Sequence, residues 1–221
     1  MATPIRFAHR GAPVHPQQEN TLAAFEAALR NGAEGLESDV RLTADGVPVL
    51  VHGTGRIHGR PLRGVLRSQL SPDIPTLAEL WERCGNHFEL ALDMSDPDAI
   101  ATVIEIARRQ DAVCRLWLTY WQLPRMVLWR RRWPEVKLVY ATMLGFPDLV
   151  LRRTARNCAA AGVDALNLHH RLISRSSAET VHATGLKLFA WGARLSKDAH
   201  RAAALGVDGV FVDDVTGERR D

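Results

Sequence analysis

The stretch IRFAHRGAPVHPQQENTLAAFEAALRNGAEGLESDV, residues 5–40, contains the pattern that decides the fold. A short apolar run that ends at His9-Arg10 predicts a strand, and the apolar spacing of residues 21–32 predicts an amphipathic helix. The run GLESDVRL (35–42) then predicts a second strand. A strand, a helix and a strand in this order indicate parallel strands joined by a crossover helix.

The same alternation continues along the chain. Further strands are predicted at 48–52, 88–94, 114–121, 137–143, 165–170, 187–193 and 209–214. Helices are predicted at 76–85, 96–110, 121–133, 147–162, 174–185 and 196–206. About eight strands favour an α/β fold of the (β/α)8 TIM-barrel type, and a doubly wound open sheet is the alternative. Since no linker or internal repeat interrupts the pattern, we expect one domain over residues 1–221.

The barrel pattern is incomplete at its end. After GVFVDD (209–214) the chain continues only with VTGERRD, which is too short and polar for an eighth outer helix. The first and last strands should therefore expose an apolar flank. Because large apolar patches usually find a partner, we expect a homo-oligomer.

The composition limits the classes of partner. A net charge of +3 is too small to imply nucleic acid, and it suits an anionic small molecule or an acidic membrane surface. LPRMVLWRRRWP (123–134) predicts either weak contact with a membrane surface or a helix with a solvated basic face. No targeting signal, no transmembrane segment and only three scattered cysteines are present, so we expect a cytoplasmic protein.

Residues that can do chemistry fall at the ends of the predicted strands. His9, His52 and Asp93 end three extended runs, and Glu37 and Asp39 share one side of a fourth. In a parallel barrel these ends meet on one face. Neighbouring carboxylates repel unless a cation lies between them, which indicates a hard divalent ion such as Mg²⁺ or Ca²⁺. Taken singly, each residue also has a plainer interpretation: a structural histidine, or a solvated acidic edge.

Several of these motifs together resemble a known family. HRG (9–11), ENT (19–21) and GAEGLESDVRLTADGVPVLVH (32–52) resemble the signature of the glycerophosphodiester phosphodiesterase family in order and spacing. FAWGA (189–193) and ALGVDGVFVDD (204–214) resemble its last two strands. Between about residues 95 and 160 only the strand–helix rhythm is similar.

The resemblance implies a TIM barrel that uses a divalent metal to hydrolyse a glycerophosphodiester to glycerol phosphate and an alcohol. It also implies a role for individual residues. These are His9 and His52 as the acid–base pair, Glu37 and Asp39 as metal ligands with Asp93 as the third, Arg10 as a phosphate contact, and Trp191 as a wall of the substrate pocket.

Two positions depart from the family pattern. The family has His-Asp where this chain has His52-Gly53, and Glu-x-Lys where it has Asp93-Met94-Ser95. An aspartate as third ligand resembles the sphingomyelinase D branch of the same superfamily, although that branch keeps the lysine. Two alternatives therefore stay open. One is a phospholipase D-like activity on lysolipids or sphingolipids, and the other is a non-catalytic barrel that binds phosphodiesters.

Overall fold

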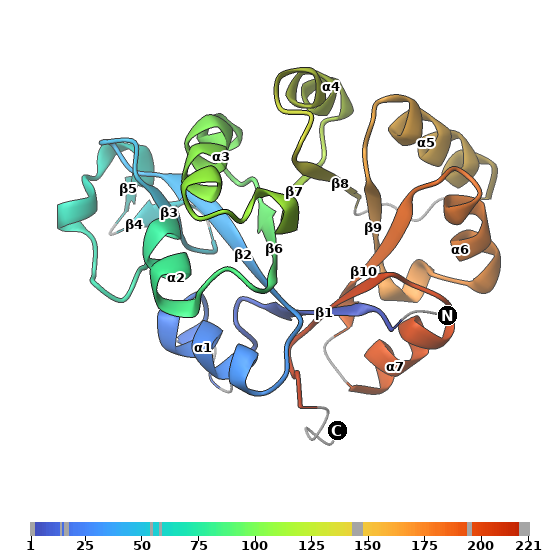
Figure 1. Ribbon diagram of the computed structural model, residues 1–221, viewed down its shortest axis with the longest axis horizontal. Helices are drawn as coiled ribbons and strands as arrows, with labels where there is room; N and C mark the ends of the chain where they lie inside the picture. Colours follow the sequence, from blue (N-terminus) through green and yellow to red (C-terminus); the bar gives the residue numbers. More distant parts are fainter. Residues whose placement is uncertain are drawn as a thin grey trace.

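The computed structural model describes residues 3–13, 15, 18–53, 55–57, 59–142, 148–193 and 196–216. Within these residues, eight parallel strands close into a barrel with helices around it (Figure 1). The strands are β1 (Ile5–His9), β2 (Gly35–Leu42), β6 (Glu89–Asp93), β7 (Leu116–Tyr120), β8 (Lys137–Ala141), β9 (Ala165–His169), β10 (Lys187–Ala193) and β11 (Gly209–Val212). Because β1 pairs with both β2 and β11, the barrel is closed and the predicted TIM barrel is confirmed.

The helices follow the strands as the sequence predicts. They are α1 (Leu22–Arg30), α2 (Leu77–Cys84), α3 (Ile100–Arg109), α4 (Leu123–Arg132), α5 (Asp148–Ala160), α6 (Arg175–His182) and α7 (Ser196–Ala204). Short 3-10 turns lie at η2 (Leu62–Gly64), η3 (Arg67–Gln69), η4 (Pro97–Ala99), η5 (Val113–Arg115) and η6 (His170–Leu172). Thr21 and Thr76 cap α1 and α2 by accepting hydrogen bonds from backbone N–H groups.

A small excursion separates β2 from α2. It contains β3 (Pro48–Leu50), antiparallel to β2, and the short hairpin of β4 (Arg56–Ile57) and β5 (Arg60–Pro61). It has its own buried cluster and lies at the edge of the molecule, at the left of Figure 1. His52 lies two residues after the end of β3 and lines the cavity of the barrel.

The part of the barrel interior toward the amino ends of the strands is filled by aromatic rings. The Phe7 ring lies 5.0 Å from that of Phe211 and 5.5 Å from that of Phe189, measured between centroids. Glycines on neighbouring strands leave room for these rings: a Cβ on Gly35 would lie 2.5 Å from Phe7 Cδ1. The barrel therefore needs Gly35 for packing, since any side chain there would meet the ring.

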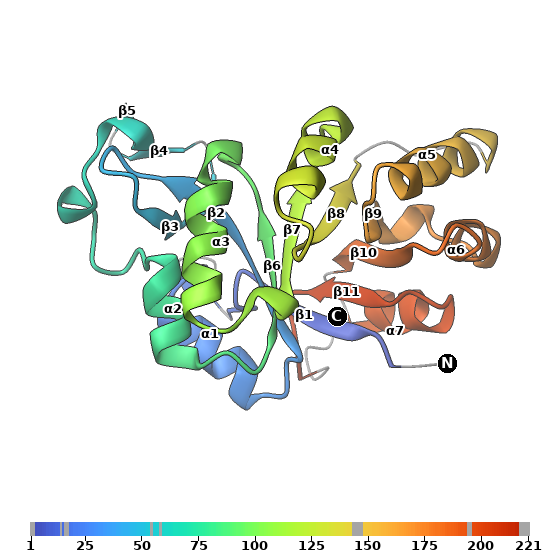
Figure 2. The ribbon, with the colours of Figure 1, turned by 45° about the horizontal axis from the view of Figure 1, so that its top comes forward.

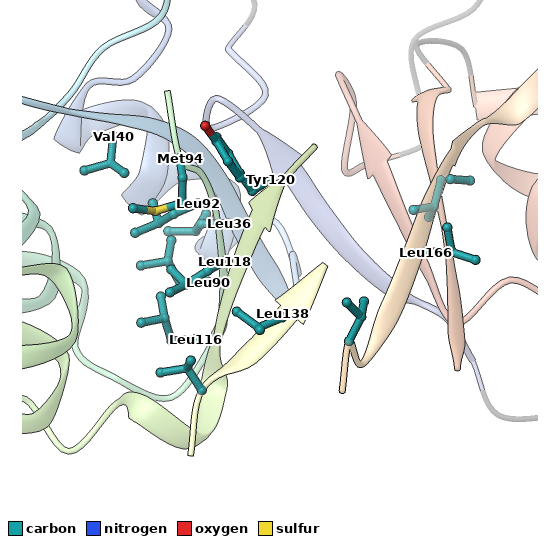
Figure 3. Close-up of a cluster of buried hydrophobic side chains, with 14 of the residues drawn as sticks. Leu36, Val40, Leu90, Leu92, Met94, Leu116, Leu118, Tyr120, Leu138 and Leu166 are labelled. Carbon is teal, nitrogen blue, oxygen red and sulfur yellow. The ribbon is translucent and has the colours of Figure 1, made fainter. Parts of the chain in front are cut away.

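The opposite faces of the strands carry aliphatic side chains toward the helices. Leu36, Leu90, Leu92, Leu116 and Leu118 are buried there, and Figure 3 shows them between the strands and the outer layer. Side chains alternate along each strand, so one parity packs against helices while the other points into the barrel. This alternation decides which residues can reach the site.

The flank of β1 and β11 differs from the prediction. As expected, no helix follows β11 up to residue 216, and the two strands lie side by side (Figure 2). However, Ala8, Val210, Val212 and Val215 are buried, and Arg6 Nη1 donates a hydrogen bond to the Val215 carbonyl at 3.2 Å. The expected apolar flank is therefore covered within the described chain. Homo-oligomerisation stays a prediction, without this reason for it.

Helix α4 has the solvated basic face that was one of the two interpretations of residues 123–134. Met126 and Trp129 are buried against the barrel, whereas Arg131 and Arg132 are exposed. None of the helices in the described ranges is long and apolar enough to cross a membrane.

The interior packing makes a testable prediction about Gly35. We expect Gly35→Ala to lower the free energy of unfolding by about 1–3 kcal/mol, because the added methyl group overpacks the ring of Phe7. The control is Gly64→Ala, where an added Cβ meets nothing within 4 Å and the backbone is unstrained. It should change stability by less than about 0.5 kcal/mol. Equal midpoints of thermal unfolding for the two variants would contradict this account.

Candidate active site

All seven residues predicted for the site line one cavity at the carboxyl edge of the barrel. The cavity has a volume of about 1150 Å³. Its lining includes His9, Arg10, Glu37, Asp39, His52, Asp93 and Trp191. The parity of the strands explains the convergence, because each of the strand residues occupies a position whose side chain points into the barrel.

The HRG motif is a tight turn that aims the backbone of Arg10 at Glu37. Arg10 has φ +51° and Gly11 has φ +81°, and a Cβ on Gly11 would lie 2.9 Å from Ala24 Cβ. The Arg10 N–H donates a hydrogen bond to Glu37 Oε2 at 3.0 Å. A left-handed conformation at a residue other than glycine is uncommon and is concentrated at functional sites.

The ENT motif fixes the other end of this loop. Asn20 has φ +57°, a conformation that asparagine tolerates, and its N–H donates to the Arg10 carbonyl at 3.0 Å. Its side-chain Oδ1 accepts a hydrogen bond of 2.6 Å from Ser38 Oγ on β2. HRG and ENT are thus two halves of one loop that is tied to the strand bearing the carboxylates.

His9 lies between two carboxylates. Its Nδ1 is 2.6 Å from Asp213 Oδ1, and its Nε2 is 4.0 Å from Glu37 Oε2. Burial disfavours the charged imidazole, but the hydrogen bond to Asp213 and the charge of Glu37 outweigh it and raise the pKa of His9. A carboxylate can only accept, so Asp213 holds the proton on Nδ1 and leaves Nε2 on the cavity side. The sequence analysis missed Asp213, although it lies within the last two residues of the strand predicted at 209–214.

Glu19 joins the two basic groups that the sequence analysis had treated separately. Its Oε2 accepts a hydrogen bond of 3.0 Å from Arg10 Nη1, and its Oε1 lies 3.4 Å from His52 Nδ1. The family aspartate next to His52 is replaced by Gly53, which has φ +103°, a conformation that aspartate rarely adopts. Glu19 is therefore the carboxylate beside this histidine.

Three carboxylates are packed together in the cavity. Asp39 and Asp93 are direct neighbours across β2 and β6. Glu37 lies two residues before Asp39 on β2, so its side chain also points into the barrel. Burial, and then the charges of neighbouring carboxylates, raise the pKa of Glu37 to about 8 and that of Asp93 to about 7. Burial also raises the pKa of Asp39. Ser95 Oγ, at the position of the family lysine, donates a hydrogen bond to Asp39 Oδ1 at 3.3 Å.

The donor set of Glu37, Asp39 and Asp93 fits a hard divalent cation. Their oxygens are the ligands that Mg²⁺ and Ca²⁺ prefer, and a cation would relieve the repulsion that raises their pKa values. In the described part of the chain the three carboxylates do not converge on one position, since no group of three His, Cys, Asp or Glu residues is placed to hold a metal. The three side chains supply suitable oxygen ligands, and binding of a metal ion would require their carboxylates to converge.

The far wall of the cavity is formed by β9 and β10. The Trp191 ring stands perpendicular to that of His169, with centroids 4.5 Å apart, and Trp191 Nε1 donates to the Thr142 carbonyl at 3.4 Å. His169 and His170 also line the cavity. Trp191 thus lines the cavity from β10, and its role as a wall of the substrate pocket stays a prediction.

The fold and the residues gathered at its carboxyl edge define a TIM-barrel protein with its candidate site at the strand ends. The model of the Glycerophosphoryl diester phosphodiesterase family matches residues 9–60 and 56–216. The chain therefore belongs to this family, as its motifs indicated.

Individual relatives agree with this assignment. Glycerophosphodiester phosphodiesterase 1 of Bos taurus is 42% identical over 100 residues, a match that covers 36% of this chain and only 30% of the bovine protein. A glycerophosphodiester phosphodiesterase of Caldanaerobacter subterraneus is 25% identical over 236 residues, a match that covers 94% of this chain and 93% of that protein. The structure of the enzyme from Thermotoga maritima superposes with a TM-score of 0.79 at 23% identity, covering 98% of this chain and 97% of that one. A phosphodiesterase of Oleispira antarctica, solved with the product sn-glycerol-3-phosphate, gives 0.75 at 24% identity, covering 96% and 93%. These two superpositions support the fold.

The raised carboxyl pKa values predict how stability depends on pH. Glu37 and Asp93 keep their protons in the folded protein up to about pH 8 and 7, but lose them near 4.5 and 3.8 when unfolded. The folded state then binds more protons, so the free energy of unfolding falls as the pH rises through this window. We expect Asp93→Asn to show a shallower fall in the midpoint of thermal unfolding between pH 4 and 8.

A divalent cation should oppose this loss, because it competes with protons for the same oxygens. Saturating Mg²⁺ or Ca²⁺ should raise the unfolding midpoint of the parent more at pH 8 than at pH 5, and that of Asp93→Asn much less. Equal affinities of the parent and the variant by calorimetry would show that Asp93 is not a ligand.

Proposed function

We propose that the protein is a metal-dependent phosphodiester hydrolase that cleaves a glycerophosphodiester to glycerol phosphate and an alcohol. The observation that carries the proposal is that His9 and His52 line one cavity with the three buried carboxylates, and each histidine has a carboxylate beside it. Membership of the family and the product bound to the Oleispira antarctica relative support this choice of substrate.

The reaction must stabilise negative charge on the phosphate. A phosphodiester carries one negative charge, and more develops on its oxygens in the transition state. Arg10 Nε makes no hydrogen bond in the described structure, although it lies 3.9 Å from Asp39 Oδ2, and in this proposal it donates to a phosphate oxygen. A divalent ion held by Glu37, Asp39 and Asp93 would add Lewis-acid stabilisation of the same charge.

The two histidines are suited to moving protons at neutral pH. One removes the proton from the attacking oxygen, and the other protonates the oxygen of the leaving alcohol. His9 is oriented for this by Asp213, which holds Nδ1 and leaves Nε2 free to exchange a proton. Glu19 is the carboxylate near the equivalent nitrogen of His52, with Oε1 3.4 Å from Nδ1, and in this proposal it orients that ring. The attacking oxygen is that of water or of the substrate's neighbouring hydroxyl group.

Lysolipids form a second candidate class of substrate. The cavity of about 1150 Å³ exceeds the usual range for small-molecule sites of roughly 300–1,000 Å³. Trp121, Tyr140 and Trp191 contribute aromatic surface to its lining. Together with aspartate as the third carboxylate, this aromatic lining is the reason to keep a phospholipase D-like activity on lysolipids as the second candidate.

The histidine roles can be tested by substitution. We expect His9→Ala and His52→Ala each to lower turnover of a glycerophosphodiester by about 10²-fold or more, because general acid–base catalysis contributes about 10²–10⁴-fold. His182→Ala is a matched control: its side chain is 40% exposed beside a carboxylate, as that of His52 is, but it lies on α6. Should the parent bind but never hydrolyse any phosphodiester with saturating Mg²⁺ or Ca²⁺, the non-catalytic alternative would hold.

Glu19 should matter through the groups that it positions. We expect Glu19→Gln to lower kcat by roughly tenfold or more, because Arg10 and His52 lose their shared carboxylate. This decrease should be smaller than the decrease in turnover caused by His52→Ala. The control Glu26→Gln removes another arginine-paired carboxylate, that of the Glu26–Arg83 pair on the surface of α1. Unchanged kcat in Glu19→Gln would show that the bridge does not position the histidine.

A further inference from the structure

Large apolar side chains are exposed at one edge of the barrel more than elsewhere. Trp121, Leu149 and Leu172 are 63%, 79% and 42% exposed. Trp121 directly follows β7, Leu149 lies at the start of α5 after β8, and Leu172 is in η6 after β9. Since β7, β8 and β9 are adjacent in the sheet, the three residues follow neighbouring strands along one sector of the carboxyl edge, here called the apolar rim.

The apolar rim is not explained by packing. A single exposed leucine is ordinary on any protein surface, but a concentration of them at a functional edge usually marks an interaction site. Among the described residues, the other large apolar side chains that are clearly exposed are Leu66, in the excursion, and Leu128, on the outer face of α4. The rim also adjoins the site, because Trp121 lines the cavity.

The charge around the apolar rim is mainly positive, although the exposed Asp148 is the chain neighbour of Leu149. Residues 121–182 include ten basic and four acidic residues, a larger excess than the +3 of the whole chain. Arg152, Arg153, Arg171 and Arg175 are exposed, and their guanidinium groups have no ion-pair partner among the described residues. Exposed apolar side chains interspersed with unpaired arginines match the chemistry of an anionic lipid surface, which accepts both.

We infer that the apolar rim docks on an anionic lipid bilayer. Trp121, Leu149 and Leu172 would enter the headgroup–acyl boundary, where tryptophan is favoured, and the arginines would face the anionic headgroups. The cavity then opens toward the membrane, and a lipid phosphodiester can enter it from there. The docking stands without any catalysis, whereas its use in delivering a lipid rests on the proposed hydrolysis.

Vesicle co-sedimentation of the full chain, without substrate, tests the docking. The parent should bind vesicles that contain phosphatidylserine, bind pure phosphatidylcholine vesicles much more weakly, and dissociate as salt screens the charges. The double variant Leu149→Ser/Leu172→Ser should bind the anionic vesicles at least about tenfold more weakly. Leu66→Ser is the control for the double variant. Leu66 is 44% exposed, about as much as Leu172, but it lies in the excursion between β2 and α2. This control should bind as the parent does.

Two further measurements make the result decisive. The double variant should keep the unfolding midpoint of the parent, and it should keep the turnover of a water-soluble phosphodiester, because neither leucine lines the cavity. Failure of the parent to bind anionic vesicles, or equal binding by the double variant, would overturn the inference. So would light scattering that shows a dimer of the parent and a monomer of the double variant, because the rim would then bind a second copy.

Discussion

The pairing of β1 with β2 is the constraint on which the rest of the structure depends. Its register sets Phe7 opposite Gly35 and His9 opposite Glu37. The first pair allows the barrel interior to be filled, because Gly35 leaves space for the ring of Phe7. The second places an imidazole beside the carboxylate cluster. Since side chains alternate, a slip of one residue would turn Phe7 outward and remove His9 from the cavity together. Packing and site are therefore specified by the same hydrogen-bonded register.

Several residues at the carboxyl edge of the barrel are held in locally unfavourable states. Glu37 and Asp93 are held where burial and mutual repulsion favour their protonated forms, and Arg10 is held in a left-handed conformation. Such conflicts are tolerated only where the surroundings determine the structure strongly. Here the Arg10 backbone N–H on Glu37 and the Asn20–Ser38 hydrogen bond supply that determination. Strain and charge repulsion thus mark the same few residues as the motifs do.

Strand parity explains what could be predicted from the sequence. Glu37, Asp39 and Asp93 were expected on one face, and the Asp39–Asp93 register bears this out. Glu19 could not be placed in this way, because it lies in a loop whose direction depends on the positive φ angles of Arg10 and Asn20. The covered flank was also beyond pattern analysis. A polar tail predicts no helix, but nothing in it indicates that Arg6 would hold the Val215 carbonyl and so bury the valines of β11.

In the proposed reaction, the absence of the family lysine changes how the charge of the phosphate is balanced. Among the described residues that line the cavity, the fixed cations are Arg10 and Arg171, and Arg171 belongs to the sector of the apolar rim. Ser95 cannot add a charge, and its hydroxyl is directed to Asp39. In the proposed reaction Arg10 and the carboxylate-bound ion would therefore carry the transition-state charge between them. A charge-assisted hydrogen bond contributes about 1.5–3 kcal/mol, so the proposed reaction should depend on a divalent ion more steeply than it would with a lysine at the position of Ser95.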